Sequence, residues 1–188
     1  MAILILGLLL FLGIHLVPTL TGLRTRLYGA LGEKRYKGLF SLASALGLVL
    51  IVIGYARAPA EPRLFAPFIG AIHAAPLAVA VSFVLLASAN MRTHIRRKLR
   101  HPMLIGVLIW SLVHLLANGE LRATVLFGAF LAWAAIDLAS ATARGAVKSF
   151  QPSVGQDIGA VVGGIGLAAL VMTYHRQLFG VVAVPWGG

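Results

Sequence analysis

The chain has 188 residues, of which 60% are hydrophobic and only 11% are charged. Soluble domains are about half apolar and about a quarter charged, so a chain this poor in charge cannot cover a water-facing surface, and the bilayer is its expected solvent. The sequence contains no cysteine, which excludes disulfides, thiolate ligation of iron, iron–sulfur clusters and cysteine-based zinc sites.

Six apolar segments follow one another along the chain. Segments without any Asp, Glu, Lys or Arg cover residues 2–23, 38–56, 64–91, 101–119 and 158–175, and a sixth, 123–143, contains only Asp137. A helix needs ~20 residues to cross the hydrocarbon, and the two-residue alternation of membrane barrels is missing. We therefore predict an all-α polytopic membrane protein, a bundle of six transmembrane helices with short loops, in one domain over residues 1–188. The first segment lacks the basic start and the cleavage site of a signal peptide, so we expect it to be retained.

Proline and glycine mark positions inside these predicted helices. Pro76 lies within the third helix, where it predicts a kink, and Pro102 lies where the fourth helix begins, a position that tolerates its missing N–H. In the sixth helix, three glycines lie four residues apart and predict a small-residue seam for close packing on a neighbouring helix. These glycines are Gly155, Gly159 and Gly163.

The net charge of +11 is concentrated on alternate connecting segments. Five Lys and Arg lie in loop 21–37, five in loop 90–102 and two in loop 144–157, against four in the connections on the opposite side. Because Lys and Arg accumulate in cytoplasmic loops, this asymmetry predicts that both termini lie outside the cytoplasm. Topology and anionic headgroups account for the basic loops, so we expect no nucleic-acid partner.

Three of the six histidines lie well inside predicted spans, namely His15, His73 and His114. Ionisable side chains at such depth are costly and usually face the protein interior. A single buried histidine is most simply a hydrogen-bonded structural residue. Three in one small bundle instead favour a shared metal site, because ligation is a common role of neutral imidazole. Trp110, Ser111 and Asn118 share the helix face of His114 and predict a polar-aromatic wall there.

His101 precedes His114 by thirteen residues, which places the two imidazoles roughly 140° apart around the helix axis. They are therefore not expected to face one site. We predict instead that Arg100 and His101 form a site at the cytoplasmic face, which binds a headgroup, a haem propionate or a second ligand, and that neither is an iron ligand.

The carboxylates do not suggest acid–base catalysis. No two of the five are paired at helix spacing, and neither a phosphate-binding loop nor a nucleophile elbow is present. Asp137, the only acidic residue inside a predicted span, is expected to form an ion pair with Arg144 or with a cation at headgroup level.

Three strings of the sequence, HLVPTLTGLRTRL, EKRYKGLFSL and HPMLIGVLIWSLVHLLANG, resemble the NnrU family of bacterial membrane proteins, named for an association with nitrite and nitric oxide reduction. That resemblance implies a multi-pass protein of the bacterial inner membrane, here with periplasmic termini, and a link to denitrification or redox metabolism. A more distant resemblance is to plant 15-cis-zeta-carotene isomerase, a haem b membrane enzyme that shares the RHP…W…H pattern.

The second resemblance implies haem b as cofactor, with His15 and His114 at the positions of the haem ligands and His73 at that of a further histidine. Without a C-x-x-C-H motif, attachment is expected to be non-covalent. Ser111 stands where the isomerase has a cysteine, so a cysteine-for-histidine ligand switch cannot be copied. The resemblance leaves enzymatic activity open: the haem could serve redox or gas chemistry, or isomerise an apolar polyene such as zeta-carotene, and no redox partner is indicated.

The expected haem pocket is built around His15 and His114. Helix rise places His15 ~7 Å, His114 ~16 Å and His73 ~24 Å from the same membrane face. Two ligands of one upright haem should lie at nearly equal depth. His73 is therefore kept as the reserve ligand, in case the depth of His15 does not match that of His114. Gly7 and Gly106 are expected to leave room for the macrocycle. The residues one turn before the ligands are expected to line the pocket: Phe11, Trp110 and Ser111.

Two other interpretations remain. RHPMLIG also resembles the RHP-x-Y-x-G stretch of isoprenylcysteine carboxyl methyltransferases, which bind S-adenosylmethionine. Here Leu104 replaces the tyrosine, and no carboxylate pair follows Trp133. The last interpretation is a membrane scaffold without a cofactor.

Overall fold

The computed structural model describes residues 1–145, 149–180 and 183. The described chain is helical throughout its membrane segments, and its helices are α1 (Ala2–Leu16), the 3₁₀ turn η1 (Val17–Thr19), α2 (Thr21–Arg57), α3 (Ile69–Ser88), α4 (His94–Leu99), α5 (Pro102–Ala117), α6 (Leu121–Ala143), α7 (Val154–Thr173) and α8 (His175–Phe179). Five of them are long and apolar enough to cross a membrane, and α5 is a shorter apolar helix. The prediction of an all-α polytopic membrane protein is confirmed.

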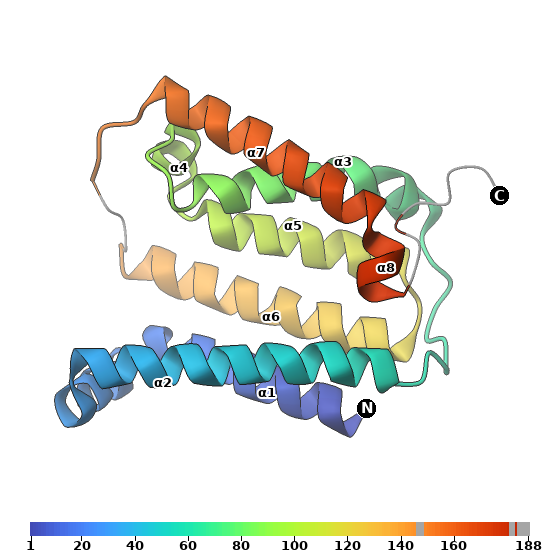
Figure 1. Cartoon of the computed structure of the whole chain (residues 1–188), viewed down its shortest axis with the longest axis horizontal. Coiled ribbons are helices and arrows are strands. Elements are labelled where there is room, and N and C mark those ends of the chain that lie inside the picture. Colours follow the sequence, from blue (N-terminus) through green and yellow to red (C-terminus); the bar gives the residue numbers. More distant parts are fainter. Residues whose placement is uncertain (146–148, 181–182, 184–188) are drawn as a thin grey trace.

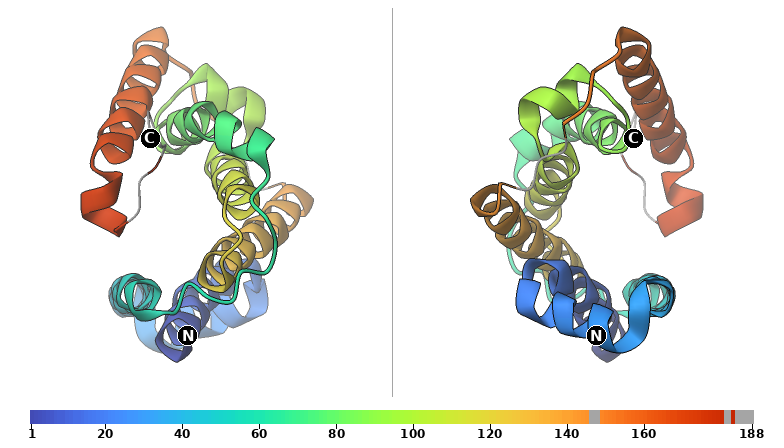
Figure 2. Two further views of the ribbon diagram at one scale, coloured as in Figure 1. Left: turned by 90° about the vertical axis from the view of Figure 1, so that its right-hand side faces the viewer. Right: turned by 90° about the vertical axis from the view of Figure 1, so that its left-hand side faces the viewer.

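The helices are arranged as an open arc (Figures 1 and 2), with α2 at one end and α7 at the other. Along the arc α2 packs on α1, α1 on α6, α6 on α5, α5 on α3 and α3 on α7. The outer surface is apolar: the side chains of Leu9 and Leu77 are 68% and 73% exposed. Large exposed apolar surfaces are costly in water and normal in lipid, so the bundle is built for a bilayer.

Glycines allow α1 and α2 to touch backbone to backbone. A Cβ atom on Gly54 would lie 2.4 Å from the amide nitrogen of Leu4, and one on Gly7 would lie 2.6 Å from that of Ile51. The expectation that Gly7 leaves room for a macrocycle is therefore wrong, because the backbone of α2 fills that space.

Gly106 has the same packing role between α5 and α3. A Cβ atom there would lie 3.0 Å from the carbonyl oxygen of Ser82, and the Ser82 hydroxyl donates to the Gly106 carbonyl at 2.7 Å. Gly106 therefore gives no room to a macrocycle either. α3 continues as one helix through Pro76.

The glycine seam predicted for α7 lies on the wrong face. Ala160, Gly164 and Ala168 are the buried residues of this helix, and a Cβ atom on Gly164 would lie 2.5 Å from the Cα of Val84 in α3. The predicted seam residues are all exposed instead: Gly155, Gly159 and Gly163. Both sets have a spacing of four, and the sequence pattern does not distinguish them.

Two of the predicted basic loops are largely helical. Residues 21–37 belong to α2, which is bent at Gly32, where φ is 71° and ψ is 160°, a conformation that favours glycine. Residues 90–102 contain α4, whose first turn is capped by the Thr93 hydroxyl, which accepts from the amide of Arg96 at 3.0 Å. The third, 144–157, lies partly outside the described residues.

The orientation of the bundle remains a prediction. Because the basic segments join α1 to α2 and α3 to α5, that end of the bundle is expected in the cytoplasm and both termini outside it. A C-terminal reporter that is active only outside the cytoplasm should therefore be active. Activity only of a cytoplasm-specific reporter at the same position would contradict this topology.

Candidate functional site

His15 lies near the end of α1, among aromatic rings of three helices. Its ring centroid is 4.3 Å from that of Phe11, 5.1 Å from that of Phe40 in α2 and 5.9 Å from that of Trp133 in α6. Its Nδ1 lies 2.6 Å from the carbonyl oxygen of Phe11, one turn earlier. The predicted proximity of Phe11 and His15 is thus present in the structure.

His114 lies near the end of α5 in a similar setting. Its ring centroid is 5.3 Å from that of Trp110 and 4.7 Å from that of Phe127 in α6. Its Nδ1 lies 2.8 Å from the carbonyl oxygen of Trp110, and the side-chain amide Nδ2 of Asn118 donates to the His114 carbonyl at 2.8 Å. The sequence placed Trp110 and Asn118 on this face, whereas Phe127 comes from a helix that it did not connect to His114.

The backbone contacts select one tautomer for both imidazoles. A carbonyl oxygen only accepts hydrogen bonds, so Nδ1 of His15 and of His114 must carry the ring proton. The lone pair of each neutral ring is then on Nε2. A neutral imidazole held through Nδ1–H to a backbone carbonyl is the usual form of a metal-ligating histidine, so the donor chemistry of both residues fits an iron of haem.

A chain of aromatic contacts links the two histidines. Successive ring contacts run from Phe11, beside His15, to Phe130 at 5.9 Å and from Phe130 to Trp110, beside His114, at 5.5 Å. The α6 neighbours of His15 and His114 are six residues apart, which corresponds to ~9 Å of helix rise. The two imidazoles therefore lie at different depths, at the two ends of the aromatic row formed by Phe11, Phe130 and Trp110.

His73 and Ser111 are placed less favourably for contact with a haem in the bundle. His73 is exposed on α3. Ser111 is fully buried, and its hydroxyl donates to the carbonyl of Val107 at 2.6 Å. Its hydrogen bond is therefore made within α5. Among the described residues, no group of three or more His, Asp or Glu could hold a metal ion.

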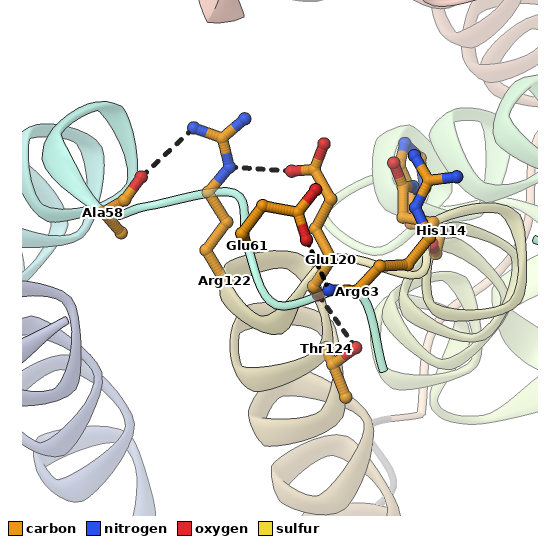
Figure 3. A network of polar contacts seen from close by, with 8 residues as sticks. Ala58, Glu61, Arg63, His114, Glu120, Arg122 and Thr124 are labelled. Atoms are coloured by element: carbon orange, nitrogen blue, oxygen red, sulfur yellow. Dashed lines mark hydrogen bonds and ion pairs between the residues drawn. The ribbon is translucent and has the colours of Figure 1, made fainter. Parts of the chain in front are cut away.

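Next to His114, the turn between α5 and α6 is paired with the segment that joins α2 to α3. The amide of Leu64 donates to the Gly119 carbonyl at 2.7 Å, and the amide of Leu121 donates to the Pro62 carbonyl at 3.1 Å. Arg122 binds Glu120 at 2.8 Å and the Ala58 carbonyl at 3.3 Å (Figure 3). This network has no signal in the sequence, since its charges are scattered along the chain and only the fold brings them together.

The turn before α5 contains a strained residue, Arg100, which precedes His101. Arg100 has φ 63° and ψ −49°, and the amide of His101 donates to the Leu99 carbonyl at 2.7 Å, which closes a γ-turn. Such a turn with positive φ is rare and strained. It directs His101 into the bundle, where its Nε2 is buried, whereas Arg100 itself is exposed.

Replacing Arg100 by glycine is expected to stabilise the protein by about 1 kcal/mol, because glycine adopts positive φ without steric cost. Arg97→Gly, in the regular helix α4, is the matched control and should cost about 0.5–1 kcal/mol. Unfolding of both variants in detergent, followed by helical circular dichroism, measures the difference. Equal destabilisation by the two substitutions would show that Arg100 is not strained.

Asp137 lies one turn beyond Trp133 on α6. Arg144 Nη2 is 4.0 Å from its Oδ1, which agrees with the expected ion pair. Asp137 lies near the end of the bundle where α1 and α6 end and α5 begins; we call this the basic end.

A family model described as "NnrU protein" matches residues 3–183. No curated protein and no solved structure matches the chain.

Proposed function

The chain belongs to the NnrU family, and from that premise we propose that it is an integral membrane protein that binds haem b non-covalently within its helix bundle. His15 and His114 are the residues that would hold its iron. The observation that supports this most is that both partly buried imidazoles hold Nδ1 against a carbonyl of their own helix, which leaves Nε2 for a metal. Since the chain has no cysteine, attachment through thioether bonds is impossible.

The residues around the proposed ligands would orient them and exclude water. The Phe11 and Trp110 carbonyls fix the two imidazole rings, and the Phe40, Phe127 and Trp133 rings surround them. Bound haem would supply one-electron and gas-binding chemistry, which suits the proposed link to nitrite and nitric oxide metabolism.

The aromatic row and the difference in depth bear on whether one or both histidines would hold the haem. His15 and His114 lie at the two ends of the ring contacts of Phe11, Phe130 and Trp110, and their α6 neighbours differ by ~9 Å of helix rise. Haem held by both histidines would therefore require the helices to rearrange, whereas haem held by one would not.

Optical spectra of the purified protein, oxidised and dithionite-reduced, test the proposal. We expect a Soret band with the low-spin pattern of two neutral imidazoles in the wild type, and the same spectrum in His73→Ala, because His73 is exposed. A high-spin spectrum would mean that only one of the two histidines ligates the iron. A wild type without any haem absorbance, even after expression with added haem, would contradict the proposal.

A further inference from the structure

A cavity of about 310 Å³ lies in the first part of α2, and four side chains of one helix face line it: Thr21, Arg24, Thr25 and Tyr28. These positions are three and four residues apart, which brings them onto the same side of a helix. The segment follows the first apolar span, which ends at Thr19, and precedes the bend at Gly32. It therefore lies at the membrane surface of the basic end.

The cavity contains hydrogen-bond donors that the described chain leaves unused. Among the described residues, Arg24 has no acidic partner and the Thr21 hydroxyl has no acceptor. The Arg24 guanidinium lies over the Tyr28 ring, 5.4 Å from its centroid, whereas the Thr25 hydroxyl donates to the Thr21 carbonyl at 3.0 Å. A guanidinium without a carboxylate, beside a free hydroxyl, is suited to bind the oxygens of an anion.

Tyr36 gives an independent indication that a polar group binds beside Tyr28. Its ring stacks on that of Tyr28, with 4.4 Å between the centroids, and the residue is only 7% exposed. Its buried hydroxyl forms no hydrogen bond to the described chain. Buried hydroxyls are nearly always hydrogen-bonded, because leaving one unpaired costs its desolvation. A ligand oxygen or a water is therefore expected beside these stacked rings.

The charge of this segment favours a phosphate. Five Lys and Arg lie in residues 21–37, and the one carboxylate there, Glu33, is already paired with Lys37 at 2.5 Å. The planar guanidinium of Arg matches two oxygens of a phosphate with two parallel N–H groups. At a membrane surface, the negative groups that attract basic segments are those of anionic lipids.

Leucines next to the cavity indicate a lipid and not a free phosphate. Leu20, Leu23 and Leu27 are three and four residues apart, and the first two are 56% and 43% exposed. A helix with basic and hydroxyl side chains on one face and leucines on the neighbouring face suits the boundary between headgroups and acyl chains. Acyl chains would cover these leucines, which a free phosphate leaves in water.

We propose that this cavity binds the phosphate of an anionic phospholipid, with Arg24 and Thr21 as donors and the acyl chains along the leucines. The inference goes beyond the haem proposal and does not depend on it, since neither His15 nor His114 lines the cavity.

Binding of phosphatidylglycerol to the full-length protein in detergent is measured by native mass spectrometry, which counts the bound lipids during a titration. Arg24→Gln and the matched control Arg26→Gln each remove one positive charge, so general attraction falls equally in both. Arg26 does not line the cavity, so only Arg24→Gln loses the charge-assisted hydrogen bonds. It should bind this lipid about tenfold more weakly than Arg26→Gln does. Thr21→Val, which keeps the charge, should weaken binding about threefold, the effect of one neutral hydrogen bond.

Two further ligands test what the cavity binds, and circular dichroism reports whether each variant is folded. Phosphatidylcholine, whose headgroup has no net charge, should bind the wild type more weakly than phosphatidylglycerol. Glycerol 3-phosphate, which lacks acyl chains, should not displace the lipid at equal concentration. Equal binding of the two lipids, or displacement by glycerol 3-phosphate, would refute an anionic lipid as the occupant. If folded Arg24→Gln and Arg26→Gln bind phosphatidylglycerol equally, the inference is overturned.

Discussion

Replacing His114 by alanine is expected to abolish haem retention while the protein still inserts into the membrane. The substitution removes the Nε2 lone pair that we propose ligates iron. It also removes the Nδ1 contact to the Trp110 carbonyl, which lies in the same helix, and the ring contact with Phe127 of α6, but no hydrogen bond between helices. Because changing even the outer partners of a metal ligand costs about 10- to 100-fold in affinity, loss of the ligand itself should leave no haem after purification.

The ratio of Soret to protein absorbance measures this effect at matched expression. His15→Ala should act in the same direction, because its imidazole is held in the same tautomer by Phe11. His73→Ala, which changes an exposed imidazole in the same bundle, is the control and should keep the full ratio. A His114→Ala protein that purifies with full haem and an unchanged spectrum would show that His114 is not a ligand.

Substituting alanine for Gly54 is expected to be the most destabilising change of a single methyl group in the crossing of α1 and α2. The new Cβ atom would lie 2.4 Å from the amide nitrogen and 2.5 Å from the Cα of Leu4. Both are backbone atoms that cannot rotate away, so the two helices must separate. Overpacking of this kind typically costs about 1–3 kcal/mol, enough to remove a large part of the stability of a marginal protein.

Gly38→Ala on the same helix is the matched control. No atom lies within 4 Å of a Cβ at Gly38, and alanine is favoured over glycine in a helix by about 1 kcal/mol. The control should therefore unfold at the same temperature as the wild type or above it, and Gly54→Ala well below it. Equal midpoints for the two variants would mean that α1 and α2 do not cross this closely.

The elements and the local surroundings of the two histidines could be predicted from the sequence. Apolar segment lengths give spanning helices, and helix geometry places Phe11 beside His15 and Trp110 beside His114, because each pair is one turn apart. These contacts depend on residues close together in the sequence. For the same reason, the ion pair of Asp137 with Arg144 could be anticipated.

Contacts between helices could not be predicted in this way. The sequence offered two glycine-containing faces of α7, and the predicted one is exposed, while Gly164 packs on Val84. The small size of Gly7 predicts a gap beside a cofactor, whereas Gly7 lies at the crossing of α1 and α2. Phe40, Phe127 and Trp133 had no sequence signal either, since they reach the two histidines from other helices.

Haem binding is tested most directly by the haem content of the wild-type protein, purified from the membranes of cells supplied with haem and measured after extraction with organic acid. We expect haem b, extractable because it is not covalently attached, at one per chain. A folded, full-length protein that yields no haem, or haem that stays with the chain after extraction, would contradict it.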